Sequence, residues 1–313
     1  MKISIIIPLY NRPQEIDELL ETLTRQIHKE FEVVVVEDGS SVSAESVVAK
    51  YQNILNLKYL TKENGGPASA RNFGARHASG DFFVFLDSDC IVEEDYTSVV
   101  AANHWKFWGG ADKAADDFSP MQKAVNYSMT SFFTTGGIRG SKSGRLDKFF
   151  PRSFNMGVTR ELFDKVGGFS DMRYGEDIDF SYKIVESGCT PHLLSGAEVC
   201  HKRRTNSCAF FRQVFASGTA RIELNRRHPS TTKLVHMLPA MYVLFSVVAI
   251  LFSIIFSVWG LVVLLLPALV WFIDSSLRNG LHIGLLSIWT SYIQIYGYGC
   301  GYIFKSLQVL LRK

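Results

Sequence analysis

The C-terminal part of the chain is almost free of charge, and this feature constrains the fold more than any other. In the 313-residue sequence, Pro239–Phe304 contains only two formally charged residues, Asp274 and Arg278. A helix needs about 20 apolar residues to cross the hydrocarbon core of a bilayer, and buried helices of soluble domains rarely sustain such a run. We therefore expect residues 238–313 to form a membrane region that follows a folded domain with most of the polar chemistry.

Two or three apolar helices fit into this region. The uncharged stretch Leu238–Ile273 accommodates two closely spaced spans, roughly over 239–257 and 259–273, with a kink at Pro267. The stretch 281–304 is richer in tyrosine, and it is either a third span or a helix that lies in the interface. Two spans would leave both flanking basic segments on one side of the membrane, so we favour two spans with an interfacial helix.

The segment before the apolar region is strongly basic. Residues 202–233 contain eight Lys and Arg side chains and one acid, Glu223. Basic residues beside a span favour the cytoplasmic side, which predicts a basic juxtamembrane linker at 221–237 and a cytoplasmic N-terminal domain at the inner (cell) membrane. Phenylalanines are interleaved with these basic residues, a composition that favours an anionic lipid surface over nucleic acid as the partner.

The N-terminal residues and the cysteines indicate a reducing compartment. The apolar run Ile3–Ile7 is too short for a secretory signal and ends at Pro8, so the N-terminal part is expected to stay where it is made. The five cysteines are odd in number, irregularly spaced and contain no CxxC pair. They therefore indicate free thiols rather than a disulfide framework or a zinc site.

Strand-like and helix-like segments alternate in the first 90 residues. Buried strands are expected at Lys2–Leu9, Phe31–Val36, Leu57–Leu60 and Phe82–Leu86. Helices are expected between and after them at Pro13–Ile27, Val42–Tyr51 and Ala68–Ala78. This alternation predicts an α/β fold, with a mainly parallel, Rossmann-like sheet that carries helices on both faces.

Three polar clusters directly follow predicted strands: residues 10–12, 37–40 and 87–89. Ligands of open α/β sheets bind at the carboxyl ends of the strands, so these clusters are expected to share one edge. No GxGxxG follows the first strand and no GxxxxGK[ST] occurs anywhere, which excludes the usual dinucleotide and P-loop sites.

The segment Asp87-Ser88-Asp89 is the sharpest of these signals. Two carboxylates at i and i+2 after a buried strand can hold a hard divalent cation between protein and phosphate oxygens. The alternative is a turn in which Asp accepts local backbone hydrogen bonds. Asp38 also has two interpretations. It either accepts backbone hydrogen bonds in a turn or accepts a hydrogen bond from the ring N–H of a nucleotide base.

Three further elements have a functional and a structural interpretation. The glycine-rich loop at 64–72 opens a helix, and Arg71 either meets phosphate there or pairs with a structural carboxylate. Glu176 and Asp177 begin a predicted helix, as an ordinary acidic first turn or as a general base for a hydroxyl proton. His201 follows a short strand and is either structural or a further ligand of the cation.

Taken together, these segments resemble the family 2 glycosyltransferases of the GT-A fold. The matching pieces are ISIIIPLYNRP (3–13), VVVVEDGSS (33–41), ENGGPASARNFGA (63–75), GDFFVFLDSD (80–89), FNMGVTRELFDKVGGF (154–169) and GEDIDFSYKI (175–184). They occur in the family's order and span roughly residues 1–220. The resemblance implies a GT-A domain over 1–220 that uses a nucleotide-sugar as donor.

The resemblance also implies the donor contacts. Pro8, Tyr10 and Asp38 would hold the base and ribose of the nucleotide-sugar. Arg71 would approach the nucleotide, and Asp87 would contact the ribose or the sugar.

The remaining candidates receive metal and acid–base roles by the same resemblance. Asp89 would bind Mg2+ or Mn2+ on the diphosphate, and His201 would complete the metal shell. Asp177 would be the base that deprotonates the acceptor hydroxyl, with Glu176 as the second candidate.

The implied reaction is an inverting transfer of one sugar to a hydroxyl of a lipid-linked saccharide or glycan at the cytoplasmic membrane face. The QxxRW motif of processive synthases is absent after Asp177, which favours single additions over polymerisation. The segment Gly109–Phe150 is the expected acceptor loop. Two alternatives stay open: a polyprenyl-phosphate glycosyltransferase that charges a lipid phosphate, and a catalytically silent module that binds nucleotide-sugar.

Overall fold

The computed structural model describes residues 1–113, 118–135, 150–201 and 206–311. The chain divides into two compact units. The first comprises residues 1–115 and 145–202, and the second comprises residues 116–144 and 203–313. A segment from the middle of the sequence therefore belongs with the C-terminal residues, which the expected boundary at residue 220 did not anticipate. All five cysteines are free thiols.

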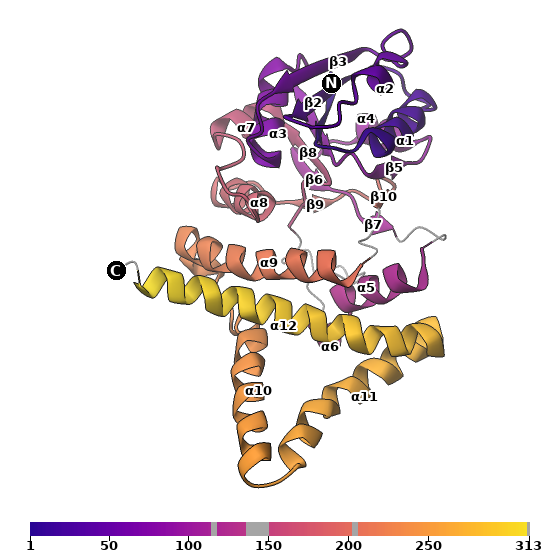
Figure 1. Ribbon diagram of the computed structural model, residues 1–313. Coiled ribbons are helices and arrows are strands. Elements are labelled where there is room, and N and C mark those ends of the chain that lie inside the picture. The colour runs from indigo at the N-terminus through magenta and orange to yellow at the C-terminus, as the bar shows by residue number, and fades with distance from the viewer. Residues whose placement is uncertain (114–117, 136–149, 202–205, 312–313) are drawn as a thin grey trace. The chain divides into compact units, whose positions relative to one another are not determined.

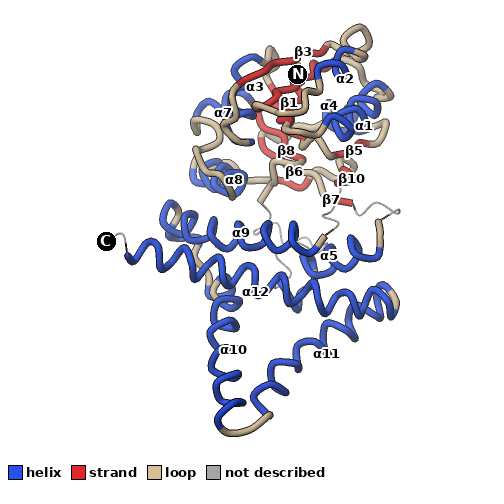
Figure 2. The backbone as a smooth tube through the Cα atoms, in the orientation of Figure 1, coloured by secondary structure: helices blue, strands red, loops and turns tan. Residues whose placement is uncertain are grey.

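The first unit is built on a seven-stranded sheet in the order β3-β2-β1-β4-β8-β6-β9 (Figures 1 and 2). The strands are β1 (Ile3–Leu9), β2 (Phe31–Asp38), β3 (Leu57–Lys62), β4 (Phe82–Leu86), β6 (Phe107–Gly109), β8 (Asn155–Thr159) and β9 (His192–Leu193). Neighbouring strands are parallel except at β8, which runs antiparallel to both β4 and β6. The predicted α/β fold with a mainly parallel sheet is confirmed.

Helices cover both faces of this sheet. They are α1 (Pro13–Thr24), α2 (Glu45–Ala49), α3 (Pro67–His77), α4 (Tyr96–Ala102), α7 (Arg160–Lys165) and α8 (Glu176–Glu186). The helix expected at Val42–Tyr51 is shorter than predicted, because the Glu37 carboxylate accepts the Ala44 N–H at 3.0 Å and fixes the chain just before α2.

The core has two halves, one on each face of the sheet. On β2, Val33 and Val35 belong to the half of the core that includes residues of α1 and α2, whereas Val34 and Val36 belong to the half that includes residues of α3 and α8. Burial on both faces is the reason why the strands are continuous apolar runs rather than alternating ones. Polar side chains are consequently concentrated at the ends of the strands.

A small second sheet has the order β5-β10-β7. It consists of β5 (Cys90–Val92), β10 (Val199–His201) and β7 (Asp112–Lys113). The antiparallel register between β5 and β10 sets residue 201 opposite Cys90. Strand β10 therefore pairs with the strand that begins directly after Asp89, although the two strands lie more than a hundred residues apart in the sequence.

A buried carboxylate fastens the amino-terminal edge of the main sheet. Glu32 accepts hydrogen bonds from the Ser4 hydroxyl, the Ser79 hydroxyl (2.8 Å) and the Gly80 N–H (3.2 Å), and pairs with the Lys58 ammonium at 3.1 Å. Burial by itself would raise the pKa of Glu32. The hydrogen bonds from Ser4, Ser79 and Lys58 outweigh it and lower the pKa from 4.5 to about 2.

The described residues of the second unit are helical. They form α5 (Pro120–Thr130), α6 (Phe132–Thr135), α9 (Ser207–Arg227), α10 (Leu238–Ile255), α11 (Trp259–Asn279), α12 (Leu281–Leu311) and two short 3₁₀ turns. Helix α12 packs against α5, α9, α10 and α11 (Figure 1). A Cβ at Gly299 would meet the Pro239 carbonyl and one at Gly301 would meet the Phe215 carbonyl, so only glycine permits these close approaches.

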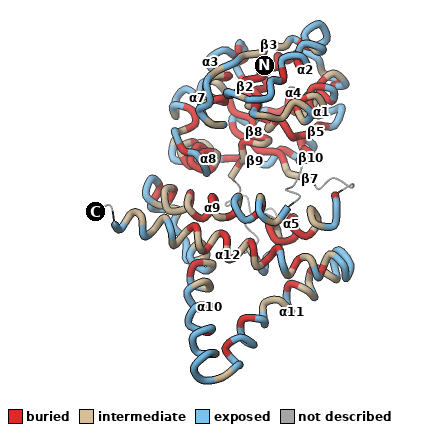
Figure 3. The backbone as a smooth tube through the Cα atoms, in the orientation of Figure 1, coloured by how far each residue is buried: buried red, intermediate tan, exposed pale blue. Residues whose placement is uncertain are grey.

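Within the described part of the chain, two helices are long and apolar enough to cross a membrane, α10 and α11. Their surfaces are largely exposed (Figure 3). Helix α11 continues past the expected end at residue 273 to Asn279 and so includes both charged residues of the apolar region. Helix α12 begins as expected and continues past residue 304 to Leu311.

We expect Glu32→Gln to lower the free energy of unfolding by about 2–4 kcal/mol at pH 7, since it weakens several hydrogen bonds to a buried charge. Because folding depresses the pKa of Glu32 from 4.5 to about 2, its stabilisation is complete above pH 4.5 and is lost as the pH falls through 2. Thermal unfolding in mild detergent at pH 7 and pH 3 measures both effects.

The difference between wild type and variant should therefore shrink at pH 3. Glu30→Gln, an exposed glutamate two residues away, is the matched control and should unfold like wild type. Equal stability of the Glu32→Gln protein at pH 7 would contradict the proposed fastening role.

Candidate active site at the carboxyl edge of the sheet

The loops after β1 and β2 are bonded to each other at the carboxyl edge of the sheet. The Asn11 side chain accepts hydrogen bonds from the N–H groups of Ser41 (2.7 Å) and Val42 (3.0 Å), and the Asn11 backbone N–H donates to the Ser40 hydroxyl (3.0 Å). Asn11 has a φ of +53°, a conformation that asparagine adopts more readily than most residues. The first two polar clusters of the sequence are thus brought together.

Two candidate donor contacts flank this junction. Pro8 lies in β1 opposite Val36 of β2, and Tyr10 directly follows β1 with 51% of its surface exposed. The tyrosine ring is therefore accessible to a ligand at this edge, whereas most apolar side chains of β1 are buried.

The Asp38 carboxylate holds the glycine-rich loop. One oxygen accepts the Lys62 ammonium (2.6 Å) and the Gly65 N–H (2.9 Å), and the other accepts the Gly66 N–H (2.7 Å). Gly66 has a φ of +84°, which favours glycine there. A carboxylate oxygen can accept two hydrogen bonds, and the second Asp38 oxygen accepts the Gly66 N–H, so this anchoring is compatible with an additional ligand contact.

Arg71 on α3 is 2% exposed and bridges two acids. Its Nη2 lies 2.6 Å from Asp87 Oδ1 and its Nη1 lies 3.0 Å from Glu176 Oε1. The guanidinium also lies over the ring of Phe169. The Asn72 side chain holds this residue by donating to the Phe169 carbonyl and accepting from the Phe169 backbone N–H. Of the two interpretations of Arg71, the structure shows the pairing with carboxylates.

The segment 87–89 is both a turn and a pair of acids. The Asp87 carbonyl accepts the Cys90 N–H (3.1 Å), and the Asp87 side chain remains partly exposed. Asp89 is nearly buried and forms an ion pair with Arg12 from the loop after β1. All three polar clusters of the sequence therefore meet at one edge.

Carboxylate oxygens of Asp87 and Asp89 are suitable ligands for a hard cation such as Mg2+ or Mn2+. Within the described residues, no three His, Cys, Asp or Glu side chains stand close enough to hold a metal ion. The backbone register brings residue 201 next to the 87–89 turn, but the His201 side chain lies outside the described side chains. Much of the expected acceptor loop, 114–117 and 136–149, lies outside the described residues as well.

Glu176 and Asp177 open α8, and their acidities are shifted in opposite directions. Burial raises the pKa of Glu176 to about 7, the negative charge of Asp177 adds to this, and Arg71 opposes it. Burial also disfavours ionised Asp177, but the Arg152 guanidinium at 3.1 Å and the Ile178 N–H outweigh it and hold the pKa of Asp177 below its ordinary value.

Near neutral pH, therefore, Asp177 is ionised and Glu176 exchanges a proton. Arg152 is not among the predicted site residues, because an isolated arginine after a long loop has no local pattern that relates it to α8.

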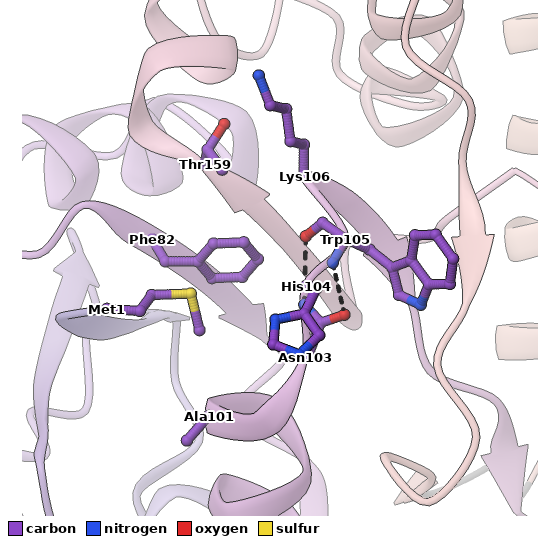
Figure 4. Close-up of a pocket in the computed structure, with 8 residues that line it drawn as sticks. All are labelled: Met1, Phe82, Ala101, Asn103, His104, Trp105, Lys106 and Thr159. Atoms are coloured by element: carbon purple, nitrogen blue, oxygen red, sulfur yellow. Dashed lines mark hydrogen bonds between the residues drawn. The ribbon is translucent and has the colours of Figure 1, made fainter.

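A shallow pocket occupies the opposite edge of the sheet, at the amino end of β4 (Figure 4). Its lining residues are Met1, Phe82, Ala101, Asn103, His104, Trp105, Lys106 and Thr159. The Asn103 side chain bonds the backbone of Trp105, which shapes the turn before β6. No acid lines this pocket, so it is separate from the candidate active site.

Known proteins match the chain mainly over its first part. The family model described as Glycosyl transferase family 2 matches residues 4–167. An uncharacterised glycosyltransferase of Haemophilus influenzae is 30% identical over 204 residues, which are 62% of this chain and 65% of that protein. The Staphylococcus aureus poly(ribitol-phosphate) beta-N-acetylglucosaminyltransferase TarS is 42% identical over 106 residues, which are 33% of this chain and 18% of that protein. The chain thus spans less than two thirds of these relatives.

Solved structures with low sequence identity share the fold. The mannosyltransferase PcManGT from Pyrobaculum calidifontis, in complex with GDP-Man and Mn2+, superposes with a TM-score of 0.66 at 17% identity over 93% of this chain and 87% of that one. S. aureus TarS 1-349 in complex with UDP has a TM-score of 0.51 at 23% identity over 98% and 92% of the two chains. With the family match extending over more than half of its length, the chain belongs to Glycosyl transferase family 2 and has the GT-A fold.

Proposed function

We propose that the chain transfers one sugar from a nucleotide-sugar donor to a hydroxyl of a lipid-linked saccharide or glycan, with inversion at the anomeric carbon. The observation that supports this most is the bridge made by Arg71, at 2.6 Å from Asp87 and 3.0 Å from Glu176. One buried cation joins the acids after β4 to the acids of α8, so the proposed donor and acceptor groups belong to a single site.

We assign donor binding to the loops after β1 and β2. Tyr10 offers an exposed aromatic face for the base. Pro8 and Asp38 lie at the same carboxyl edge of the sheet as Tyr10, and Asp87 is paired with Arg71. The structural neighbours solved with GDP-Man and with UDP support a nucleotide donor for this fold.

We assign the divalent cation to Asp89, with Asp87 and His201 as further candidates. When bound, Mg2+ or Mn2+ offsets the negative charge that develops on a departing diphosphate. Arg12 neutralises Asp89 in this structure and is the group that a cation would replace or supplement. The mannosyltransferase neighbour, solved with Mn2+, supports this assignment.

We assign the general base to Asp177. Arg152 keeps its carboxylate ionised, so it can accept the proton of an acceptor hydroxyl at neutral pH. The hydroxyl oxygen then bonds to the anomeric carbon on the face opposite the leaving diphosphate, which gives inversion. Glu176, with a pKa of about 7, is the second candidate for this role.

Arg152 also favours a second candidate function, transfer to a lipid phosphate such as a polyprenyl phosphate. Its partly exposed guanidinium suits a phosphate acceptor, which needs no strong base. For either acceptor we propose that α10 and α11 cross the inner membrane and that the first unit is cytoplasmic, as the basic segment at 202–233 predicts.

Replacing Asp177 by asparagine should lower turnover by about 10²–10⁴-fold and leave donor binding unchanged, because the variant cannot accept a proton. Release of nucleoside diphosphate in the presence of acceptor and calorimetric binding of the donor provide the two readouts. Asp164→Asn, on the exposed side of α7, is the matched control. Equal losses of binding and turnover would make Asp177 a substrate-holding residue, and unchanged turnover would favour a phosphate acceptor.

The pH dependence of kcat/KM should contain a limb near pH 7 that belongs to Glu176. Because burial raises the pKa of Glu176 to about 7, its carboxylate is protonated below that pH and ionised above it, where it pairs fully with Arg71. We expect kcat/KM to rise through this range in wild type, and Glu176→Gln to remove the limb. A limb that persists in the variant would assign it to another group.

Donor hydrolysis across a panel of nucleotide-sugars should depend on a divalent cation. With Mn2+ or Mg2+, the purified full chain is expected to release one nucleoside diphosphate from its own donor, and EDTA should stop this release. Asp89→Asn should raise the cation concentration for half-maximal rate at least about tenfold, since a carboxylate ligand is lost. Activity that is insensitive to EDTA would refute the cation assignment.

A further inference from the structure

The proposed reaction has no use for Asp274 and Arg278, the two formal charges of Pro239–Phe304. Charged side chains in an apolar segment are costly in a membrane and usually mark a functional position. Both residues lie in the last turns of α11, one helical turn apart.

Asp274 fixes the position of Arg278. Its Oδ1 accepts from Arg278 Nε and lies near Nη2, each at 2.9 Å. The Asp274 side chain is only 17% exposed, whereas that of Arg278 is 63% exposed. One edge of the guanidinium is therefore bound to its own helix, and the rest remains accessible.

The α5–α6 corner is clamped to the same turns of α11. The Ser131 hydroxyl donates to Asp274 Oδ2 at 3.4 Å, and the indole N–H of buried Trp271 donates to the Phe133 carbonyl at 3.1 Å. The corner thus contacts α11 at two residues that are one turn apart. Asp274 is covered from this side, whereas most of the Arg278 side chain remains exposed.

Exposed apolar side chains lie on the clamped corner and near this end of α11 in the sequence. Phe132 and Phe133 on the clamped corner are 70% and 50% exposed, and their rings pack edge to face. Leu277 and Leu281, on either side of Arg278 in the sequence, are also exposed. An accessible guanidinium among exposed aromatic and aliphatic groups is the arrangement of a side chain at the boundary between lipid phosphates and acyl chains.

We propose that Arg278 binds the phosphate of a membrane phospholipid at the polar end of α11, with Phe132 and Phe133 against its acyl chains. A guanidinium forms charge-assisted, often bidentate hydrogen bonds with phosphate. The exposed apolar residues on the clamped corner and along α11 favour a lipid over free phosphate. Asp274 acts as the positioning residue that presents the guanidinium.

The test measures equilibrium binding of phosphatidylglycerol to the purified full chain in mixed micelles, without any sugar donor. Diacylglycerol with the same acyl chains and inorganic phosphate serve as competitors. Phosphatidylglycerol should bind, diacylglycerol should compete weakly and inorganic phosphate should not compete at millimolar concentration. Arg278→Gln should weaken binding about tenfold or more, because the charge-assisted bonds are lost, and Arg278→Lys should retain part of the affinity.

Arg25→Gln is the matched control, because Arg25 also pairs with an acid four residues earlier, Glu21, and both side chains are exposed at the end of α1 in the first unit. It should bind the lipid like wild type. The double variant Asp274→Asn/Arg278→Gln leaves no unpaired charge and should lose binding to the same extent as Arg278→Gln, which guards against misfolding as the cause.

Three outcomes would overturn the proposal. Unchanged affinity in both Arg278 variants would remove the residue from the site. Equal competition by diacylglycerol would indicate an apolar surface without a phosphate contact. Competition by inorganic phosphate would indicate an anion site that does not require lipid. None of these outcomes bears on sugar transfer, which is measured separately.

Discussion

The buried guanidinium of Arg71 is the interaction on which the candidate site depends. An arginine stays charged at any accessible pH, and a buried charge is tolerated only when it is paired and hydrogen-bonded. Asp87 and Glu176 provide this pairing from the end of β4 and the start of α8. The requirement to neutralise one cation therefore ties the neighbouring elements α3 and β4 to the start of α8, which lies about a hundred residues later in the sequence.

The same cluster makes two adjacent carboxylates chemically different. Glu176 shares Arg71 with Asp87 and is nearly buried, so burial dominates and its pKa rises to about 7. Burial also disfavours ionised Asp177, but the Arg152 guanidinium, the Ile178 N–H and the charge of Arg71 together outweigh it and hold the pKa of Asp177 below its ordinary value. Neighbouring positions at one helix start are thus distinguished by their own cationic and hydrogen-bonding partners, which outweigh burial at Asp177 but not at Glu176.

The sequence predicted the sheet well because two-sided burial leaves uninterrupted apolar strands, and it predicted the shared edge because parallel strands end on one side. The sequence pattern places Glu37 and Asp38 in one cluster, although successive side chains of a strand point to opposite faces. Asp38 anchors the glycine-rich loop, while Glu37 bonds Ser43, Ala44 and Tyr59 on the other face. The reversed direction of β8 and the partner of Asp177 depend on long-range contacts, which local patterns do not encode.

Long-range contacts also explain where the helices of the apolar region end. The charge of Asp274 predicts a helix end at residue 273. Helix α11 nevertheless continues past it, because the Asp274 carboxylate accepts hydrogen bonds from Arg278 and Ser131. Ser131 belongs to residues 116–144, a segment of the second unit that lies in the sequence between the two segments of the first unit. Apolar residues of α5 in turn pack with α9 and α12, and the Ser128 hydroxyl bonds that of Thr290 at 2.6 Å. A chain cut at residue 202 would leave α5 without these partners, because the second unit is assembled from residues 116–144 and 203–313 together.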